Sequence, residues 1–372
     1  APDPSSLVSG DSPSKMTSDF TLRQLIEVGF EMEASDVFVK SDQRPMMKHV
    51  SIIKPLPGDW PVLNQEMVCR MMSELMTEKQ LKRFEDTMEM DLAFAVGDKC
   101  RVRANFYLQR GTWAAVCRII PLTIRSIEQL GLPPVLNELT KHRLGLILVT
   151  GPTGSGKTTT LAALIDKINI DRPCHIVTIE DPLEFVHQDK QSYVSQREVN
   201  IDTTDFQPAL RAVVREAPDV ILIGEMRDPE TMAVAMQAGE TGHLVFSTVH
   251  TASAYETMDR IVNMFPPHEK QHLCQRLAGS LRAIIAQKLV PRADGQGRVV
   301  ALEILICTPT VSKAIEDGHF SDLYHMMNEG TFWGMQTMNQ SLVRYVKAGI
   351  ISEDIAMKYA GIASELKQML RR

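Results

Sequence analysis

Residues 145–158 of this 372-residue chain read GLILVTGPTGSGKT, a short apolar strand followed by a complete phosphate-binding loop of the pattern GxxxxGK[ST]. Glycines let such a loop fold tightly, so that backbone N–H groups converge on a phosphate at the start of the next helix, predicted over 159–168. Lys157 can reach the β- and γ-phosphates, and the Thr158 hydroxyl can ligate Mg²⁺. We therefore expect the chain to bind a nucleoside triphosphate. The predicted binding residues are Gly151, Pro152, Thr153, Gly154, Ser155, Gly156, Lys157, Thr158 and Thr159.

Hydrolysis also needs a group that positions a water molecule, and two downstream strand ends carry suitable carboxylates. The run VTIEDPLE (177–184) predicts a buried strand that stops at Glu180, because Pro182 cannot continue the ladder. The run DVILIGE (219–225) predicts a second apolar strand, which ends at Glu225. In a parallel sheet both ends lie at the edge that carries the phosphate loop. Strand ends are often acidic merely because they are exposed, but two of them behind a phosphate loop favour a hydrolytic site.

Two histidines flank a further predicted strand in TGHLVFSTVHT (241–251). His250 stands at its carboxyl end, level with the phosphate loop, where it could sense the γ-phosphate; His243 stands at the other end. A single histidine is more often a hydrogen-bonded structural residue than a catalytic one. Both interpretations stay open for this pair.

A group of arginines nearer the N-terminus has a similar double interpretation. Arg101 and Arg103 share one face of a predicted strand because side chains alternate along a strand, and Arg118 interrupts an otherwise apolar strand. They are either solvated or salt-bridged surface residues, or arginines that neutralise γ-phosphate charge in a neighbouring subunit.

The elements that must position these residues form two predicted domains behind an N-terminal tail. Residues 1–18 are rich in Pro, Ser and Asp and predict a disordered tail. Residues 19–121 predict a small α+β domain, and 122–140 a linker containing GLPP. A methionine-rich stripe over 66–76 is interpreted as core filler. Within this first domain we expect helices over 20–30 and 66–76, and strands over 36–40, 91–96, 101–108 and 113–119.

Residues 141–372 predict an α/β domain, because strands alternate with helices. This pattern is typical of a mainly parallel sheet with helices on both faces. The last sixty residues are predicted to be helical. The expected strands are 145–150, 175–180, 219–224, 243–249 and 298–306, and the expected helices include 229–238, 252–264 and 269–287.

The composition limits the class of protein. The net charge of −6 weighs against a surface that coats nucleic acid, so no direct nucleic-acid partner is expected. Six scattered cysteines without a CxxC pattern predict reduced, mostly buried thiols inside the cell, with neither disulfides nor a zinc site. No apolar run reaches the 18 or more residues that a membrane span needs.

Taken together, the motifs resemble the type II/IV secretion ATPase family, and most of all its type IV pilus retraction (twitching-motility) branch of PilT and PilU type. The resemblance covers residues 20–372 and implies a PAS-like N-terminal domain joined to a RecA-like ATPase domain, a homo-hexameric ring, and ATP with Mg²⁺ as cofactors. Besides the phosphate loop, it rests on TIEDPLEF (178–185), PDVILIGEMRDPE (218–230), the histidine segment 241–251, GMQTM (334–338) and ASDVF (34–38).

The resemblance also implies roles for single residues. Glu180 is the implied water-activating carboxylate, while Thr158 and Glu225 hold the metal ion, Glu225 through a water molecule. ATP is implied to bind between the two domains at a subunit boundary, with the segment 121–134 as a hinge. The implied catalytic residues are Glu180, Glu225, His250, Arg103 and Arg118, the two arginines acting on a neighbouring subunit, with His243 as a further candidate.

The role within the family stays open at this point. The chain lacks the four-cysteine insert and the longer N-terminal region usual in assembly-type and type II secretion ATPases, which favours retraction. Two departures from the retraction pattern, KAIEDGHF (313–320) and Asn339 where Asp is frequent, keep both a principal motor and an accessory PilU-type paralogue open. The implied partners are an inner-membrane pilus platform protein and a paralogous retraction ATPase, at the cytoplasmic face of the cytoplasmic membrane.

Three alternatives remain beside the retraction motor. The first is a secretion, conjugation or pilus-assembly ATPase of the same superfamily. The second is a weakly catalytic, ATP-binding regulatory subunit, which the intact Lys157, Glu180 and Glu225 disfavour. The third is a RecA-like nucleic-acid translocase, which the acidic net charge and the lack of a basic, aromatic-rich segment disfavour.

Overall fold

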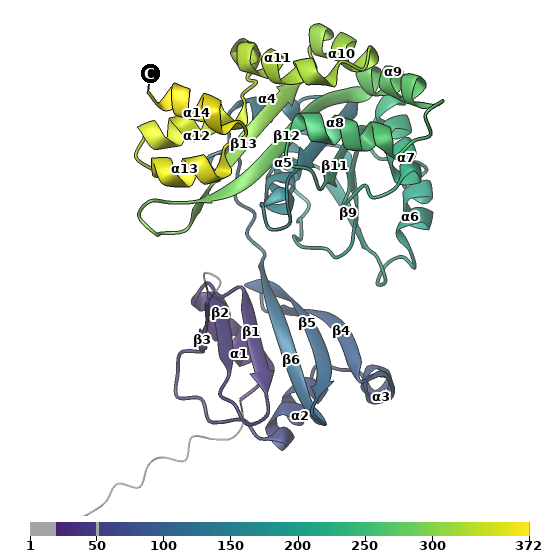
Figure 1. Cartoon of the computed structure of the whole chain (residues 1–372). Helices are drawn as coiled ribbons and strands as arrows, with labels where there is room; N and C mark the ends of the chain where they lie inside the picture. The colour runs from purple at the N-terminus through teal and green to yellow at the C-terminus, as the bar shows by residue number, and fades with distance from the viewer. Residues whose placement is uncertain (1–19, 50–51, 372) are drawn as a thin grey trace, which may run out of the picture. The chain divides into compact units, whose positions relative to one another are not determined.

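The computed structural model describes residues 20–49 and 52–371. The chain divides into two compact units, Ala1–Leu122 and Thr123–Arg372 (Figure 1). The predicted disordered tail, 1–18, lies outside the described residues. Each unit has its own hydrophobic core, and the two are described separately below.

The N-terminal unit is built around an antiparallel sheet of six strands in the order β3-β2-β1-β6-β5-β4. The strands predicted from alternation are present, with small changes at their ends, and three elements were missed: β2, β3 and α3. The elements are α1 (Leu22–Glu31), β1 (Asp36–Lys40), β2 (Met46–His49), β3 (Ile52–Pro55), α2 (Gln65–Ser73), α3 (Glu78–Thr87), β4 (Glu89–Val96), β5 (Cys100–Gln109) and β6 (Thr112–Pro121).

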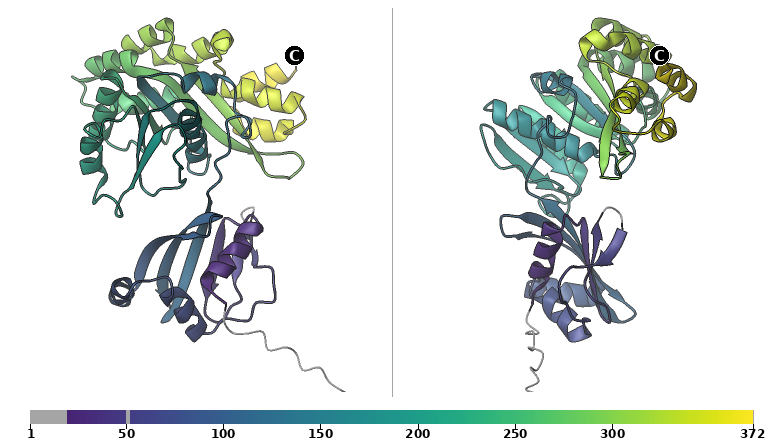
Figure 2. Two further views of the ribbon diagram at one scale, coloured as in Figure 1. Left: turned by 180° about the vertical axis from the view of Figure 1, so that it is seen from behind. Right: turned by 90° about the vertical axis from the view of Figure 1, so that its left-hand side faces the viewer.

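Helix α1 lies across one face of this sheet (Figure 2). It begins at Thr21, whose hydroxyl accepts from the N–H of Gln24 while the Gln24 side chain accepts from the N–H of Thr21. Leu22, Leu25 and Ile26 then fall on the face that packs against the sheet, as the helical spacing requires. The methionine-rich stripe of α2 is buried in the same core, as predicted.

The C-terminal unit contains a sheet of seven strands in the order β13-β12-β7-β11-β10-β8-β9. Every pair from β12 to β9 is parallel, and β13 is antiparallel to β12. The elements are α4 (Val135–Leu139), β7 (Gly145–Thr150), α5 (Lys157–Asp171), β8 (His175–Glu180), β9 (Tyr193–Glu198), α6 (Phe206–Val213), β10 (Val220–Ile223), α7 (Pro229–Glu240), β11 (Leu244–Val249), α8 (Ala254–Asn263), α9 (Lys270–Ser280), β12 (Leu281–Pro291), β13 (Arg298–Ile306), α10 (Pro309–Glu316), η1 (Phe320–Asp322), α11 (Leu323–Glu329), η2 (Gly330–Trp333), α12 (Met338–Lys347), α13 (Glu353–Tyr359) and α14 (Ala363–Leu370).

Helices cover both faces of this sheet, which confirms the predicted fold class. Alternate residues of β7 enter separate cores: Leu146 and Leu148 pack with α7 to α10, whereas Ile147 and Val149 pack with α4 and α5. All six residues of β7 are buried. A strand buried on both faces is continuously apolar, which is the pattern that identified β7 in the sequence.

Two predictions for this unit were wrong. The predicted helix 269–287 ends at Ser280, and the chain continues as the central strand β12. Most of the predicted linker 122–140 belongs to the C-terminal unit, because apolar side chains along it are buried against α5 and β7. Those side chains are Ile127, Leu132, Leu136 and Leu139.

Helices α12 to α14 form a small cluster beside β12 and β13 (Figure 1). Lys288 of β12 reaches this cluster, since its Nζ donates to the Tyr359 carbonyl at 3.2 Å. Asn339 lies at its centre and is almost completely buried. The Asn339 side-chain amide donates to the Ile362 carbonyl at 2.9 Å and to Glu365 at 2.7 Å, and its oxygen accepts from the N–H of Gly361 at 3.0 Å. An aspartate could not donate these bonds, so Asn339 and Glu365 are a matched pair.

We expect Asn339→Asp to lower the free energy of unfolding by about 1–3 kcal/mol, because it removes the hydrogen bonds that the Asn339 amide donates and sets a negative charge against Glu365. Denaturant unfolding followed by circular dichroism measures this. The double variant Asn339→Asp/Glu365→Gln should recover part of the loss, whereas Gln368→Glu, which adds a charge at an exposed position of α14, should cost little. A double variant no more stable than Asn339→Asp alone would contradict the pairing.

Candidate active site

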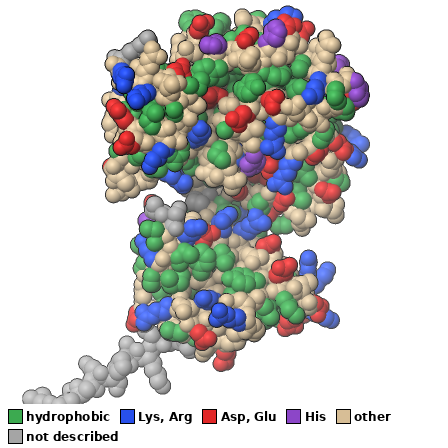
Figure 3. Space-filling model, viewed as in Figure 1, with side chains coloured by type: hydrophobic (Ala, Val, Ile, Leu, Met, Phe, Trp, Pro, Cys, Tyr) green, Lys and Arg blue, Asp and Glu red, His purple; other side chains and the backbone are tan. Residues whose placement is uncertain are grey.

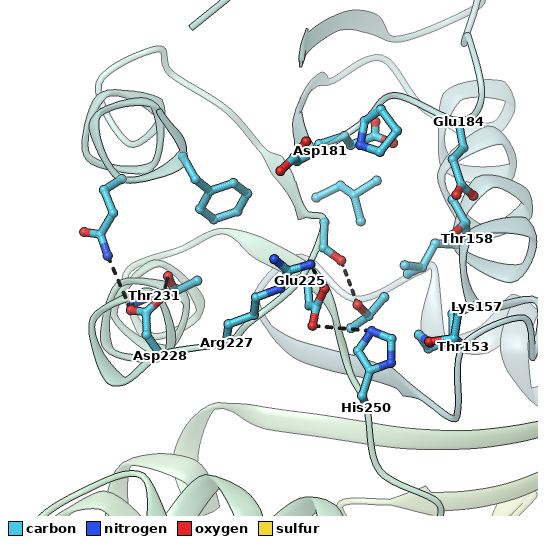
Figure 4. A pocket seen from close by; sticks show the side chains of 18 of the residues that line it. Thr153, Lys157, Thr158, Asp181, Glu184, Glu225, Arg227, Asp228, Thr231 and His250 are labelled. Atoms are coloured by element: carbon cyan, nitrogen blue, oxygen red, sulfur yellow. Dashed lines mark hydrogen bonds and ion pairs between the residues drawn. The ribbon is translucent and has the colours of Figure 1, made fainter. Parts of the chain in front are cut away.

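A cavity of about 380 Å³ opens at the carboxyl edge of the parallel strands. Figure 4 shows Thr153, Thr158 and Lys157 on one side of it and Asp228 and Thr231 on the other, with the Glu225 and His250 side chains between them. The cavity is lined by Thr153, Gly154, Lys157, Thr158, Leu161, Glu180, Asp181, Pro182, Glu184, Asp205, Phe206, Gln207, Leu222, Gly224, Glu225, Arg227, Asp228, Thr231, Thr248 and His250.

The phosphate loop joins β7 to α5 and forms one wall of the cavity. Lys157 is 8% exposed, and its ammonium donates to the carbonyls of Gly151 at 2.9 Å and Pro152 at 3.2 Å. Burial lowers the pKa of Lys157, although the charges of Glu225 and Glu184 oppose that shift. Helix α5 begins without a side-chain cap, so its first N–H groups remain available for an anion.

The other predicted loop residues shape this wall. Gly151 has φ of +146°, and a Cβ there would lie 2.5 Å from both the Gln287 carbonyl and the Ser155 hydroxyl. Gly156 caps α5 in the left-handed conformation, and Thr159 lies in the first turn of α5. The two glycines therefore determine the backbone conformation of the loop. Thr159 does not line the cavity.

Gln287 of β12 holds the phosphate loop through a hydrogen bond, and the sequence analysis did not predict a role for it. Its amide nitrogen donates to the Ser155 carbonyl at 2.7 Å, and the side chain is 1% exposed. The sequence offered no signal for this contact, because the residue was assigned to a helix and the two partners are 132 positions apart.

Glu180 ends β8 and lies 6% exposed at the floor of the cavity. Its Oε1 accepts from the Thr178 hydroxyl at 2.8 Å and from the Gln196 amide at 3.4 Å. Burial raises the pKa of Glu180 to about 7, more than these hydrogen bonds lower it. A carboxylate with a pKa near neutrality is suited to accept a proton from water.

Glu225 follows β10 and has different surroundings. Arg227 donates to its Oε2 at 2.6 Å, and His250 Nε2 lies 3.3 Å from its Oε1. Burial alone raises the pKa of Glu225, but the Arg227 hydrogen bond and the charges of His250, Arg227 and Lys157 outweigh it, so the pKa lies below the usual value. Glu225 therefore stays ionised where Glu180 can exchange a proton, and environments that separate two carboxylates in this way are typical of divided catalytic roles.

The segment around Glu225 is fastened to the neighbouring strand β11. The Thr248 hydroxyl donates to the Gly224 carbonyl at 2.7 Å, and the Met226 N–H donates to the Thr248 carbonyl at 3.0 Å. These bonds fix Glu225 beside His250, which comes just after β11. The sequence segment 218–230 contains Arg227, but no role was predicted for it. Arg227 is the cation that holds Glu225. Its position two residues after Glu225 was the one feature of the sequence that could have indicated this pairing.

His243 does not join this site. It comes before β11, at the opposite edge of the sheet, where its Nδ1 lies 3.0 Å from the Ala238 carbonyl. It has the hydrogen-bonded structural role that was the alternative interpretation.

Arg103 and Arg118 belong to the N-terminal unit and are cross-strand neighbours on β5 and β6. Val102 and Ile119, the residues next to them on β5 and β6, are buried in the core on the face that α1 covers. Because side chains alternate along a strand, Arg103 and Arg118 point to the opposite face. Arg118 pairs with the buried Asp36 at 3.2 Å, while 65% of its own side chain stays exposed. Salt bridging and exposure thus coexist at Arg118.

Surface charge, cysteines, membrane-spanning helices and metal-ligand clusters were the features from which the sequence limited the class of protein. On the face of the C-terminal unit in Figure 3, acidic and basic side chains are interspersed. The six cysteines are free thiols. Among residues 20–49 and 52–371, no helix combines the length and apolar character that a membrane span requires. In the same residues, no three His, Cys, Asp or Glu side chains are grouped so as to hold a metal ion.

Comparisons with known proteins agree with this architecture. The family model for type II/IV secretion system protein matches residues 19–345. A twitching motility protein of Neisseria gonorrhoeae is 46% identical over 81% of this chain and 80% of its own length. The type IV pilus retractation ATPase PilT of Pseudomonas aeruginosa is 41% identical over 92% of this chain and 98% of its own. The type IV pilus ATPase PilU of the same species is 36% identical over 94% and 90%.

A solved structure, described as the pilus retraction motor PilT with bound ADP, superimposes with a TM-score of 0.87 at 40% identity, covering 94% of this chain and 100% of that one. The chain therefore belongs to the type II/IV secretion system protein family. It is a nucleotide-binding ATPase of that family.

Removal of Lys157 or Glu180 should separate binding from hydrolysis. We expect Lys157→Ala to lose ATP affinity and Glu180→Gln to keep affinity while its turnover falls by about 100-fold or more, because the base is lost. Fluorescent-nucleotide titration and phosphate release measure the two effects. Glu316→Gln, which changes a carboxylate of α10 that does not line the cavity, is the matched control. Undiminished turnover in both site variants would contradict the site assignment.

Proposed function

We propose that this chain is the ATP-hydrolysing motor of type IV pilus retraction. The observation that carries the proposal is a cavity holding both a phosphate-binding lysine and two carboxylates of divided character, in a chain similar to PilT over nearly its whole length. The intact site favours a catalytic motor over a regulatory subunit.

The chemistry follows from the two carboxylates. Glu180 accepts a proton from a water molecule while the water oxygen bonds to the γ-phosphorus. The bond between that phosphorus and the β,γ-bridging oxygen breaks, and ADP leaves with the electron pair. Lys157 and the first N–H groups of α5 would neutralise the phosphate charge, and His250, which lines the same cavity, would respond to the γ-phosphate.

The oxygen donors at the cavity fit Mg²⁺. Thr158 and the ionised Glu225 both line it, and Mg²⁺ prefers oxygen ligands while it keeps several waters and binds phosphates. Such an ion needs no cage of three protein carboxylates. Thr158 would hold it directly and Glu225 through water, and the ion would supply charge neutralisation at the β- and γ-oxygens.

A homo-hexamer would complete the site, with Arg103 and Arg118 acting on the nucleotide of a neighbouring subunit. Their sheet face is not the one that packs against α1, and Asp36 fixes the direction of Arg118, which supports this role. Closure of the ring would then couple hydrolysis to a change in the angle between the two units. The hinge would be limited to the residues just before Ile127, because Ile127 and Leu132 are packed in the core of the C-terminal unit.

Mixing inactive subunits tests the action of the arginines in trans. We expect Glu180→Gln and the double variant Arg103→Ala/Arg118→Ala to be inactive separately, but a 1:1 mixture to regain about a quarter of the wild-type turnover, because a quarter of the random neighbour pairs combine an intact base with intact arginines. Arg83→Ala, an exposed arginine of the same unit, should stay active alone. A mixture that remains inactive after subunit exchange would contradict action in trans.

We further propose an inner-membrane pilus platform protein as the partner, at the cytoplasmic face of that membrane, with a paralogous retraction ATPase as a second one. The similarity to both PilT and PilU supports this setting. An accessory role of PilU type is the second candidate, favoured by the departures at 313–320 and Asn339.

Pilus counts in a strain that lacks the gene test the direction of movement. We expect many static surface filaments, restored to normal numbers by the intact gene or by Glu316→Gln, but not by Glu180→Gln. Electron microscopy and a twitching assay provide the counts and the motility. Bare cells would indicate assembly instead, and an unchanged count with weakened retraction would indicate the accessory role.

A further inference from the structure

Gln196, on the edge strand β9, has a side-chain amide that uses both N–H donors and its oxygen in hydrogen bonds close to Glu180. Its nitrogen donates to Glu180 Oε1 at 3.4 Å and to the Phe185 carbonyl at 2.9 Å. Its oxygen accepts from the N–H of His187 at 2.7 Å. The three contacts connect the carboxylate at the floor of the cavity with the chain segment that follows it.

The register of the sheet explains why Gln196 reaches Glu180. Gln196 is the direct neighbour of Thr178 in the parallel pair β8–β9. Thr178 and Glu180 are two positions apart on β8, so their side chains share one face. The Thr178 hydroxyl and the Gln196 amide consequently donate to the same oxygen, Glu180 Oε1.

The contacts to Phe185 and His187 fasten the segment 181–192, which connects β8 to β9. This segment contributes Asp181, Pro182 and Glu184 to the cavity wall. Because Gln196 donates to one backbone group and accepts from another two residues on, it substitutes for a neighbouring strand.

The far part of the same segment is fastened separately, by Asn169 of α5. The Asn169 side chain donates to the Gln188 carbonyl at 2.7 Å and accepts from the N–H of Lys190 at 3.1 Å. The anchoring of the segment and the contact with Glu180 can therefore be changed independently.

We propose that Gln196 is a positioning residue for ATP hydrolysis, which holds the Glu180 carboxylate by one oxygen and fixes the adjoining wall of the cavity. This inference rests on the proposed role of Glu180 as the base. The donated hydrogen bond favours the ionised carboxylate, so its loss raises the pKa of Glu180. The base is active when deprotonated, and with a pKa of about 7 its activity rises with pH through neutrality.

The test is the pH dependence of kcat for ATP hydrolysis by the full chain in Gln196→Met, which keeps the volume and removes the hydrogen bonds. We expect the acid limb to move to higher pH by about 0.5 unit, which below neutrality is about a threefold loss of kcat, with little change of KM. Gln196→Glu, which sets a second negative charge beside Glu180, should move the limb further. Thr178→Val removes the other donor and should move it in the same direction.

Two comparison variants separate this role from loosening of the segment. Asn169→Ala should lower kcat at every pH without moving the acid limb, and Gln191→Ala, an exposed glutamine of the same segment, should leave the profile unchanged. If the acid limbs of Gln196→Met and Thr178→Val coincide with the acid limb of the wild type, the inference about Gln196 is wrong, while the proposed base is unaffected. Full turnover in Glu180→Gln would instead overturn the proposed base.

Discussion

The parallel pairing of neighbouring strands is the constraint on which the site depends. Because β7, β8, β10 and β11 run in one direction, their carboxyl ends meet at a single edge of the sheet. The phosphate loop, Glu225 and His250 each follow one of these strands and Glu180 ends another, although about a hundred residues separate the first from the last. Reversal of one strand would remove its residue from the cavity, as the position of His243 at the other end of β11 demonstrates.

Burial and charge then shift the pKa values of two chemically identical side chains, Glu180 and Glu225, in opposite directions. Glu180 is enclosed, receives hydrogen bonds from neutral donors and holds its proton up to about pH 7. Glu225 faces Arg227 and His250 and loses its proton readily. A short apolar strand ending in a glutamate thus gives a carboxyl group that titrates near neutrality in one place and one that stays ionised in the next, according to what the neighbouring strands present.

Local patterns in the sequence predicted the parts of the fold that depend on nearest neighbours along the chain. The phosphate loop, β7, β8 and the ends that carry Glu180 and Glu225 are of this kind. Strand β12 was mistaken for helix because it is buried on both faces, lacks alternation and contains helix-favouring Ala, Leu and Gln. The contacts of Gln287 with Ser155, and of Gln196 with Glu180, arise from strand neighbours distant in sequence and leave no local signal.

Strand β12 has a mechanical consequence. Gln287 grips the phosphate loop at Ser155, and the next residue, Lys288, points to the opposite side of the strand and grips the C-terminal helices at Tyr359. Because β12 is hydrogen-bonded to β7 on one side and to β13 on the other, its backbone between Gln287 and Lys288 is held on both sides. The loop that faces the cavity and the last helices of the described chain are thus joined through a single strand, although they do not share a hydrogen bond with each other.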